Sequence, residues 1–249
     1  MIAITHVPSP RLEQCELTHV DRVPIDLELA FEQHASYCAA LESAGCAVRT
    51  YDFNREYSDS AFVEDVAVVL EELIVLGSMG AKSREPEMEG WRQRLREFRR
   101  VVDLPYGAKF EGGDVLRVDR DLFIGISTRT NLIGIEAVTR LVKAHGYVVH
   151  SVPVVGCLHL KTACTAIDED TFLVNPRWLD CSILAHKKVV VAADPWGANV
   201  VRLPNQVLAN SQNVATIEQL RQLGYSVISV DLSEYTKAEA GATCLSLLI

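Results

Sequence analysis

Residues 27–53 read LELAFEQHASYCAALESAGCAVRTYDF. The apolar side chains of the first part recur at the helical period, and Asp26 stands just before them, where an N-cap residue is expected. Gly45 follows in the position of a glycine that ends a helix, and residues 46–53 then alternate like a strand. The stretch therefore predicts a helix over residues 27–43, followed by a turn and a strand over residues 46–53.

The same unit of helix, glycine and strand returns further along the chain. The predicted units are a helix over 136–145 with a strand over 147–155, a helix over 213–223 with a strand over 225–230, and two weaker copies, 92–100 with 101–102 and 179–187 with 188–193. Strands are also predicted at 2–7 and, as pairs, within 63–77, 114–126 and 158–174. This alternation predicts a single α/β domain of stacked or radial supersecondary repeats.

A radial arrangement would bring equivalent loops to one centre. Asp65 follows the first repeat glycine, Gly45, while His159 follows Gly146 and Cys244 follows Gly224. These three side chains are far apart in the sequence but come from corresponding parts of the repeat. We therefore expect them to meet in one pocket.

Composition limits the classes of partner. The chain has 249 residues, a hydrophobic fraction of 49% and a net charge of -9, which fits a globular protein and argues against nucleic acid or an anionic membrane as partner. The start of the chain lacks the features of a signal peptide, and no apolar run is long enough to span a bilayer. Seven cysteines without a Cys-x-x-Cys pair favour reduced thiols in the cytoplasm. For the oligomeric state, a homodimer and a monomer both remain alternatives.

A single thiol near the end of the chain is the candidate nucleophile. Cys244 lies between a polar segment, residues 234–243, and a short apolar run, residues 245–249. A cysteine attacks as the thiolate, so it requires a base or an electropositive neighbourhood. We expect that base and its acidic partners among His159, Asp65 and Glu111.

The candidate acids each have a structural alternative. Glu64 and Asp65 stand at the mouth of a predicted apolar strand, where they either face solvent or bind a cation in a cleft. Glu111 precedes Gly112 and Gly113, which favour either a hairpin turn or a place where backbone approaches a ligand closely.

The candidate bases are similarly ambiguous. Arg129 and Arg84 either cap turns or bind a carboxylate, for which the guanidinium fork is suited. His159, between two leucines, is either a structural histidine or an acid–base group. A metal site at His159 with Cys157 and Cys164 is disfavoured, because the spacing matches no common zinc motif.

Five short motifs, in this order and spacing, resemble the dimethylarginine dimethylaminohydrolase family of the guanidine-modifying amidinotransferase superfamily. They are Phe62-Val63-Glu64-Asp65, Glu111-Gly112-Gly113-Asp114, Ser127-x-Arg129-Thr130-Asn131, Leu158-His159-Leu160-Lys161 and Thr243-Cys244-x-Ser246. The resemblance covers nearly the whole chain. It implies a five-bladed propeller-like ring of ββαβ units, the pentein fold, with residues 1–249 as one guanidine-modifying hydrolase domain.

The resemblance also implies a role for each site residue. Cys244 is similar to the family's nucleophile, His159 to its general acid and base, and Asp65 and Glu111 to the carboxylates that hold the guanidinium. The implied substrate-binding residues are Leu17, Asp59, Glu64, Asp65, Arg84 and Arg129, with the arginines on the α-carboxylate and Asp59 and the Leu17 carbonyl on the α-amino group. No metal or organic cofactor is implied.

The implied reaction is hydrolysis of an N-omega-methylated L-arginine to citrulline and a methylamine. Two departures from the family pattern, Ser78-Met79-Gly80 before Arg84 and the loop before Leu17, lie on the substrate-binding side. Three alternatives remain from the sequence: a deiminase or amidinotransferase acting on another guanidine, a non-catalytic binding protein on the same fold such as a ribosome anti-association factor, and a metal-binding module.

Overall fold

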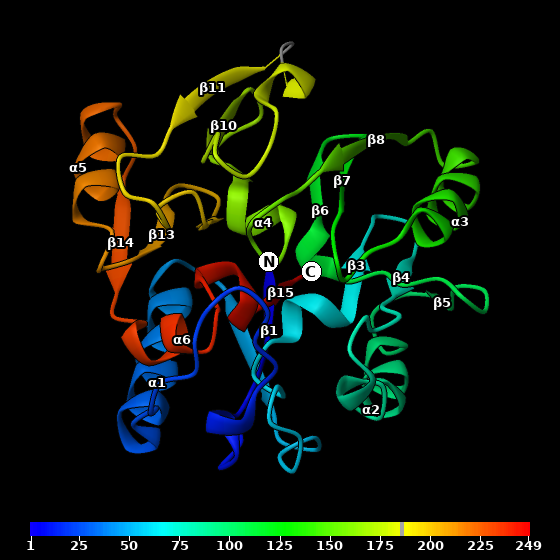
Figure 1. Cartoon of the computed structure of the whole chain (residues 1–249), viewed down its shortest axis with the longest axis horizontal. Helices are drawn as coiled ribbons and strands as arrows, with labels where there is room; N and C mark the ends of the chain where they lie inside the picture. Colours follow the sequence, from blue (N-terminus) through cyan, green and yellow to red (C-terminus); the bar gives the residue numbers. More distant parts are fainter. Residues whose placement is uncertain (185–186) are drawn as a thin grey trace.

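The computed structural model describes residues 1–184 and 187–249, and in these residues the strands form five three-stranded sheets arranged in a ring (Figure 1). The strands are β1 (Ile2–His6), β2 (Ala47–Tyr51), β3 (Ala67–Val69), β4 (Ile74–Leu76), β5 (Val101–Val102), β6 (Val115–Val118), β7 (Asp121–Ile126), β8 (Val148–Pro153), β9 (Cys164–Ala166), β10 (Thr171–Val174), β11 (Lys188–Val191), β12 (Val200–Arg202), β13 (Val207–Asn210), β14 (Val227–Val230) and β15 (Leu247–Leu248). The predicted five-bladed ring is confirmed.

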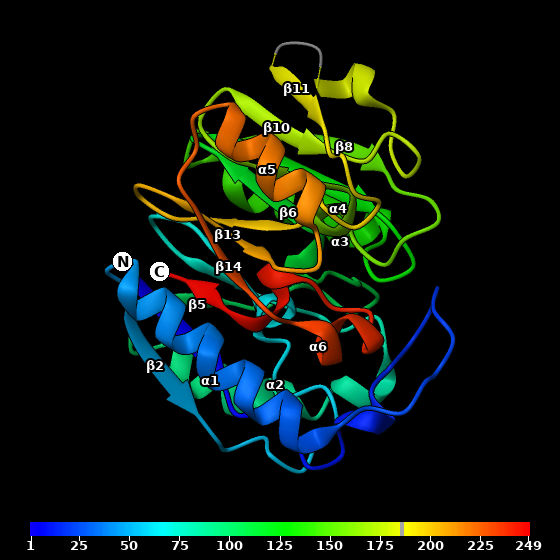
Figure 2. The ribbon, with the colours of Figure 1, turned by 90° about the vertical axis from the view of Figure 1, so that its left-hand side faces the viewer.

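Each sheet follows one pattern. A middle strand pairs antiparallel with an inner strand and parallel with an outer strand, as β7 does with β6 and β8. Parallel neighbours need a crossover, and a helix usually supplies it. The helices are α1 (Leu27–Ser43), α2 (Glu87–Leu95), α3 (Leu132–Lys143), α4 (Leu160–Ala163), α5 (Val214–Gln222) and α6 (Ser233–Lys237). Of these, α1, α2, α3 and α5 make crossovers and lie at the outside of the ring (Figures 1 and 2).

The two ends of the chain close the ring together. The last strand, β15, pairs antiparallel with the first, β1, in the register Ala3 to Leu248 and Ile4 to Leu247. The amide of Ile2 donates to the carbonyl of Ile249 at 2.8 Å. The final blade is therefore built from both termini, and the segment that carries Cys244 is joined to the first strand.

Three of the predicted helices have different limits. The helix predicted from residue 136 begins at Leu132, because the Asn131 side chain accepts from the amide of Gly134 and caps that earlier turn. The helix predicted over 92–100 is α2, which begins after Pro86 and ends at Leu95. The helix predicted over 179–187 is only a 3-10 turn, Cys181–Leu184, and Ala185 and His186 lie outside the described residues.

Two predicted strand segments are turns. Residues 63–66, predicted as the start of a strand, form a 3-10 turn that leads into β3, because this turn packs against the backbone of Gly112. Residues 158–163, predicted within a strand pair, contain α4, and the strand begins only at Cys164. The pairs β6–β7 and β9–β10 are confirmed within the predicted segments.

In the blade formed by β12, β13 and β14, the antiparallel pair β12–β13 was not predicted. Strands β12 and β13 pair in the register Val200 to Ala209 and Val201 to Leu208, ahead of the predicted unit of α5 and β14. With three and four residues, these strands are too short to show a clear alternation. Among the described residues, no helix is long and apolar enough to cross a membrane.

Candidate active site

Each blade carries a polar residue in the turn that leads into its inner strand, one to five residues before that strand begins. In the turns ahead of β3, β6, β9, β12 and β15 these residues are Asp65, Glu111, His159, Asn199 and Cys244. Because the inner strands surround one centre, these turns lie near the middle of the ring (Figure 1). The expectation that distant residues meet at one centre is confirmed for Asp65, His159 and Cys244, which line the same cavity.

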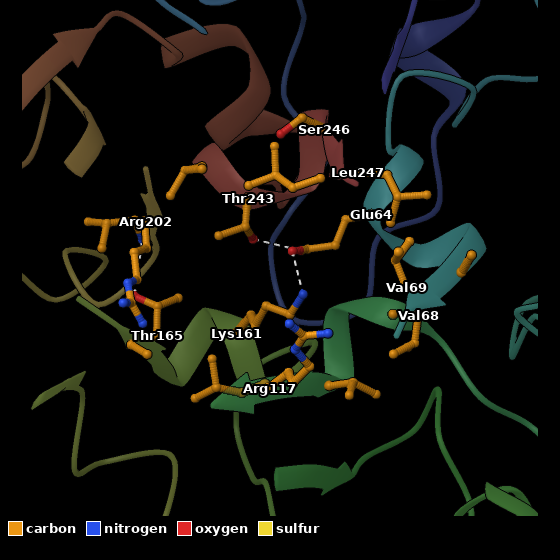
Figure 3. Close-up of a pocket in the computed structure, with 18 residues that line it drawn as sticks. Glu64, Val68, Val69, Arg117, Lys161, Thr165, Arg202, Thr243, Ser246 and Leu247 are labelled. Carbon is orange, nitrogen blue, oxygen red and sulfur yellow. Dashed lines mark hydrogen bonds and ion pairs between the residues drawn. The ribbon is translucent and has the colours of Figure 1, made fainter. Parts of the chain in front are cut away.

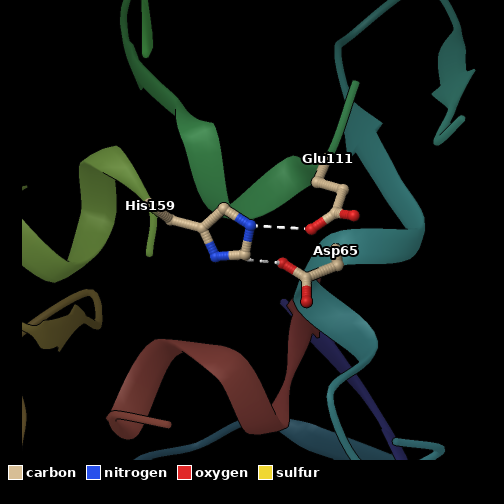
Figure 4. Close-up of side chains that lie close together, drawn as sticks. All are labelled: Asp65, Glu111 and His159. Carbon is tan, nitrogen blue, oxygen red and sulfur yellow. Dashed lines mark hydrogen bonds and ion pairs between the residues drawn. The ribbon is translucent and has the colours of Figure 1, made fainter. Parts of the chain in front are cut away.

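His159 lies between two buried carboxylates (Figure 4). Its Nε2 atom is 2.7 Å from Oε2 of Glu111, and its Nδ1 atom is 3.7 Å from Oδ1 of Asp65. Glu111 is held in turn by the amide of Gly80, which donates to Oε1 at 2.8 Å. The imidazole ring therefore has a fixed orientation beside two acids, which is unlike an isolated structural histidine.

The carboxylates control the protonation state of His159. Burial would lower the pKa of the imidazole, but the negative charges of Asp65 and Asp114 and the hydrogen bond to Glu111 outweigh it and raise this pKa from 6.5 to about 9. For Asp65, burial would raise the pKa, while His159 and Arg84 lower it below the ordinary value. At neutral pH the site therefore holds an imidazolium beside an ionised Asp65.

The diglycine turn permits this close packing. A Cβ atom on Gly113 would lie 2.6 Å from Nδ1 of His159 and 2.7 Å from Oδ1 of Asp65, and one on Gly112 would lie 2.0 Å from the Glu64 carbonyl oxygen. The Gly113 amide itself is 3.3 Å from Oδ1 of Asp65. Gly112–Asp114 forms a 3-10 turn rather than a hairpin turn, and the glycines serve the close backbone approach that the sequence left open.

Cys244 lies in the 3-10 turn Ala242–Leu245, before β15. The Gly241 amide lies 3.4 Å from the Cys244 sulfur, with the geometry of a weak donor. Burial, followed by the negative charges of Glu64 and Asp65, raises the pKa of the thiol well above its ordinary value. The resting residue is therefore a thiol, and a positive charge placed among these acids would favour its ionisation.

Arg129 reaches the cavity from the loop after β7. Its Nη1 atom is 3.7 Å from Oε1 of Glu111, and its Nη2 atom donates to the Thr18 hydroxyl at 3.3 Å. The side chain is buried, yet these are long contacts for a guanidinium. Arg129 therefore has donors that an anionic group of a ligand can use.

Arg84 also lines the cavity, but internal partners hold it. Its Nη1 atom is 2.6 Å from Oδ2 of Asp65, its Nε atom is 3.2 Å from Oε1 of Glu87, and Nη2 donates to the Phe62 carbonyl at 3.0 Å. These contacts fix the position of Asp65. The predicted contact of Arg84 with a substrate carboxylate stays a prediction.

The proposed α-amino site lies at the edge of the cavity. Asp59 lines it, and its carboxylate accepts from the Glu16 amide at 3.1 Å and from the Ser58 hydroxyl at 2.7 Å. Burial raises the pKa of Asp59. Leu17 lies next to this contact in the sequence, but Glu16 is the loop residue that lines the cavity, so the role of the Leu17 carbonyl stays a prediction.

Glu64 is a candidate that the structure places on a different cavity from the one containing Cys244. Its Oε1 atom is 2.6 Å from Nζ of Lys161, and its Oε2 atom accepts from the Thr243 hydroxyl at 2.6 Å. All three residues line a second cavity on the far side of the turns (Figure 3). The Glu64–Lys161 pair therefore belongs to the wall of this second cavity.

Two residues of the site were missed by the sequence reasoning. Glu239 lines the cavity, has a positive φ of 59°, and accepts from the amides of Thr18 and His19 at 2.7 and 3.0 Å. Asn199 fixes the turn before Cys244, because its carboxamide bonds the Thr243 amide at 3.0 Å and the Thr243 hydroxyl at 3.0 Å. The repeat position before β12 would have indicated Asn199, but strand β12 was not predicted.

One group of side chains in the described residues could hold a metal ion. Ligand atoms of Asp65, Glu111 and His159 lie within 4.8 Å of one another. The disfavoured set of His159 with Cys157 and Cys164 is not this group. Both carboxylates already contact a basic side chain, Arg84 or His159, so the group is equally suited to a planar organic cation.

Comparisons with known proteins agree with this geometry. Residues 55–194 match the family model described as arginine deiminase. The chain is 33% identical to an N(G),N(G)-dimethylarginine dimethylaminohydrolase of Streptomyces coelicolor over 98% of this chain and 95% of the relative. It is 28% identical to the enzyme of that name from Pseudomonas aeruginosa over 89% of each chain.

Solved structures resemble the whole ring. A Cys-to-Ser variant of the enzyme from Pseudomonas aeruginosa, complexed with citrulline, superposes with a TM-score of 0.91 at 26% identity and covers 98% of this chain and 97% of that one. A His-to-Gly variant of a dimethylarginine dimethylaminohydrolase, as an adduct with S-methyl-L-thiocitrulline, superposes with a TM-score of 0.92 at 26% identity and 98% coverage of both chains.

Proposed function

The chain belongs to the dimethylarginine dimethylaminohydrolase family, and from this premise we propose that it hydrolyses N-omega-methylated L-arginine to L-citrulline and methylamine or dimethylamine. The observation that carries the proposal is that a thiol, a charged imidazole and the Asp65 carboxylate line one cavity, with the Glu111 carboxylate hydrogen-bonded to that imidazole. A scaffold protein has no need of such a set, because burying ionised groups is costly unless they are paired.

The carboxylates favour a cationic, planar substrate. Asp65 and Glu111 flank His159 and are buried, so a guanidinium that enters beside them replaces lost hydration with charge-assisted hydrogen bonds. The cation also offsets the negative charges that raise the pKa of Cys244. Binding of the substrate therefore assists formation of the thiolate.

The first half-reaction would release the amine. The Cys244 thiol loses its proton to solvent water, and the thiolate attacks the central guanidinium carbon and forms the carbon–sulfur bond, while the flanking acids keep the substrate protonated until this attack. His159, an imidazolium at neutral pH, gives its proton to the departing nitrogen. Methylamine or dimethylamine leaves, and a thiouronium remains on sulfur.

The second half-reaction would release citrulline. Neutral His159 removes a proton from water, and the resulting hydroxide attacks the thiouronium carbon. The carbon–sulfur bond then breaks, its electron pair returns to Cys244, and the remaining hydroxyl proton passes to this sulfur, which leaves the ureido group of citrulline on the product and restores the thiol. The two steps return His159 to its protonated form without any redox change.

The amino-acid end of the substrate would be held away from the thiol. We assign its carboxylate to Arg129, because this guanidinium has donors without short partners, with Arg84 behind it. The α-amino group would contact Asp59 and the Leu17 carbonyl. Glu64 would support the site through Lys161 and Thr243 rather than by touching the guanidinium.

A panel assay tests the proposal. Purified protein is given N-methyl-L-arginine, N,N-dimethyl-L-arginine, L-arginine and agmatine, and both citrulline and free amine are measured. The proposal predicts equal amounts of citrulline and methylamine or dimethylamine from the methylated substrates. Ammonia and citrulline from L-arginine with no turnover of methylated substrates would indicate a deiminase, and an amidino group on an added amine would indicate a transferase.

Three further expectations belong to the proposal. Residues 1–249 act as one domain, because both termini share a blade. The protein works in the cytoplasm, which the seven free thiols favour. Association as a homodimer or presence as a monomer is decided by light scattering on the purified protein.

A further inference from the structure

The second cavity lies at the far mouth of the ring, and the Glu64–Lys161 pair forms part of its wall. It measures about 860 Å³ when the solvent in its mouth is included, and apolar side chains of the inner strands form much of its wall. Arg117 and Arg202 bring guanidinium groups to this wall (Figure 3). Neither arginine lines the cavity that contains Cys244.

The two arginines occupy equivalent positions in the repeat. Arg117 is the third residue of β6, and Arg202 is the third residue of β12. Strand β9 contacts both of these strands, and its third residue is the small Ala166. The arginines therefore flank Ala166 in the ring of residues around the mouth, and this short side chain leaves space between them.

The charge of this cavity is opposite to that of the whole molecule. Glu64 and Lys161 offset one another at 2.6 Å, and the Thr243 hydroxyl satisfies the other oxygen of Glu64. The remaining charged groups of the wall are Arg117 and Arg202. The mouth thus carries two extra positive charges, although the chain has a net charge of -9.

Both guanidiniums have unused donors. Within residues 1–184 and 187–249, neither side chain makes a hydrogen bond, and their ion pairs are long: 3.9 Å from Arg117 to Glu71 and 3.6 Å from Arg202 to Glu169. The side chains of Glu71 and Glu169 are 58% and 70% exposed. Such exposed pairs contribute little, so they compete weakly with a ligand.

We propose that the far mouth of the ring binds a small tetrahedral dianion of the phosphate class between Arg117 and Arg202. Each guanidinium presents five donors in a fork that matches the oxygens of such an ion. A dianion balances the two positive charges, whose ion pairs with the exposed Glu71 and Glu169 are long. The concave, largely apolar wall strengthens the attraction relative to an open surface.

Calorimetric titration of the full-length protein with inorganic phosphate at low ionic strength tests this site. Saturating citrulline is present throughout, so that the arginines of the active site are already engaged. Wild type is expected to bind one phosphate per chain. Arg117→Gln and Arg202→Gln are each expected to weaken binding by about tenfold or more, because each removes charge-assisted hydrogen bonds.

Arg140→Gln is the matched control. It removes the same charge from an exposed arginine of α3, whose side chain is 70% exposed and pairs with Glu136 at 3.8 Å. This variant should keep the wild-type affinity for phosphate. Sulfate should compete with phosphate at the same site, and all three variants should keep the wild-type turnover of methylated arginine.

Three results would overturn the proposal. Titration of wild type without any saturable heat would show that the mouth binds no phosphate. An equal loss in Arg140→Gln would show diffuse attraction to surface charge. Phosphate binding that survives both Arg117→Gln and Arg202→Gln would place the anion outside this mouth.

Discussion

Nε2 of His159 lies 2.7 Å from Oε2 of Glu111, and both side chains are buried. This contact orients the ring and, with Asp65 on its other nitrogen, stabilises the imidazolium form. A protonated imidazole beside a candidate thiol is the arrangement that a reaction with an amine leaving group requires. The acid–base role of His159 is therefore the first part of the account to test.

Replacement of His159 by alanine is expected to lower kcat by about 10²–10⁴-fold, the usual contribution of one acid–base group. His159→Gly is expected to accumulate the thiouronium, because the second step lacks a base for water. The measurement is citrulline release together with the mass of quenched enzyme. His145→Ala, at the end of α3, is the control and should retain activity; near-normal rates in His159→Ala would make His159 a structural residue.

The pH dependence of stability follows from the same histidine. Its pKa is 6.5 in the unfolded chain and about 9 in the fold, so its contribution is fully present below pH 6.5 and is lost as pH rises through 9. The shift corresponds to roughly 3 kcal/mol at 1.36 kcal/mol per unit. We expect the difference in unfolding free energy between wild type and His159→Gln to decrease across this range in urea titrations. A difference that is constant from pH 6 to 10 would contradict the raised pKa.

Gly113→Ala is expected to reduce turnover while preserving the five-bladed fold. The new methyl group would meet Nδ1 of His159 at 2.6 Å and Oδ1 of Asp65 at 2.7 Å, so it must push these two side chains away from their positions. Because small errors in catalytic geometry are costly, we expect about 10²-fold lower kcat. Gly146→Ala is the control: it replaces a glycine of positive φ, 78°, with open space around it, and should affect stability but not kcat. Equal kcat in wild type and Gly113→Ala would show that the reaction tolerates displacement of the His159 and Asp65 side chains.

The α-carboxylate of the substrate should matter for recognition. Agmatine lacks this group and would leave Arg129 buried without its partner, at a cost of about 2–5 kcal/mol. We therefore expect kcat/KM for agmatine to be roughly 30-fold or more below that for N-methyl-L-arginine. Arg129→Ala should lower kcat/KM for the amino acid and change agmatine little. Equal kcat/KM for agmatine and the best arginine derivative on wild type would refute the carboxylate contact.

The repeat could be predicted from the sequence where its helices are long and end at a glycine. Helix α1 with Gly45, and the units ending at Gly146 and Gly224, have clear helical periods and glycines of positive φ that end them. Strands β12 and β13 of the blade that ends with β14 were missed, because strands of three and four residues carry too little pattern. The start of α2 depends on Pro86, while the predicted helix followed apolar and basic residues further on.

The residues that would carry chemistry themselves could be named from the sequence, whereas those that position others could not. Asp65, Glu111, His159 and Cys244 were identified by residue type and motif, and the fold brings three of them into hydrogen-bonding or ionic contact. The contact of Glu239 with the amides of Thr18 and His19 joins segments more than 200 residues apart, and no local pattern encodes it. The placement of Glu64 on the far side of the turn also depends on the fold, because adjacent acids in a 3-10 turn point in different directions.

The central claim is covalent chemistry at Cys244, and trapping the intermediate tests it most directly. Wild type and His159→Gly are mixed with N,N-dimethyl-L-arginine, quenched in acid and analysed by intact mass and peptide mapping. The account predicts an added mass equal to the substrate minus dimethylamine, on the peptide that bears Cys244, and no turnover in Cys244→Ser. An adduct on Cys15 or Cys157, or citrulline formation by Cys244→Ser, would contradict it.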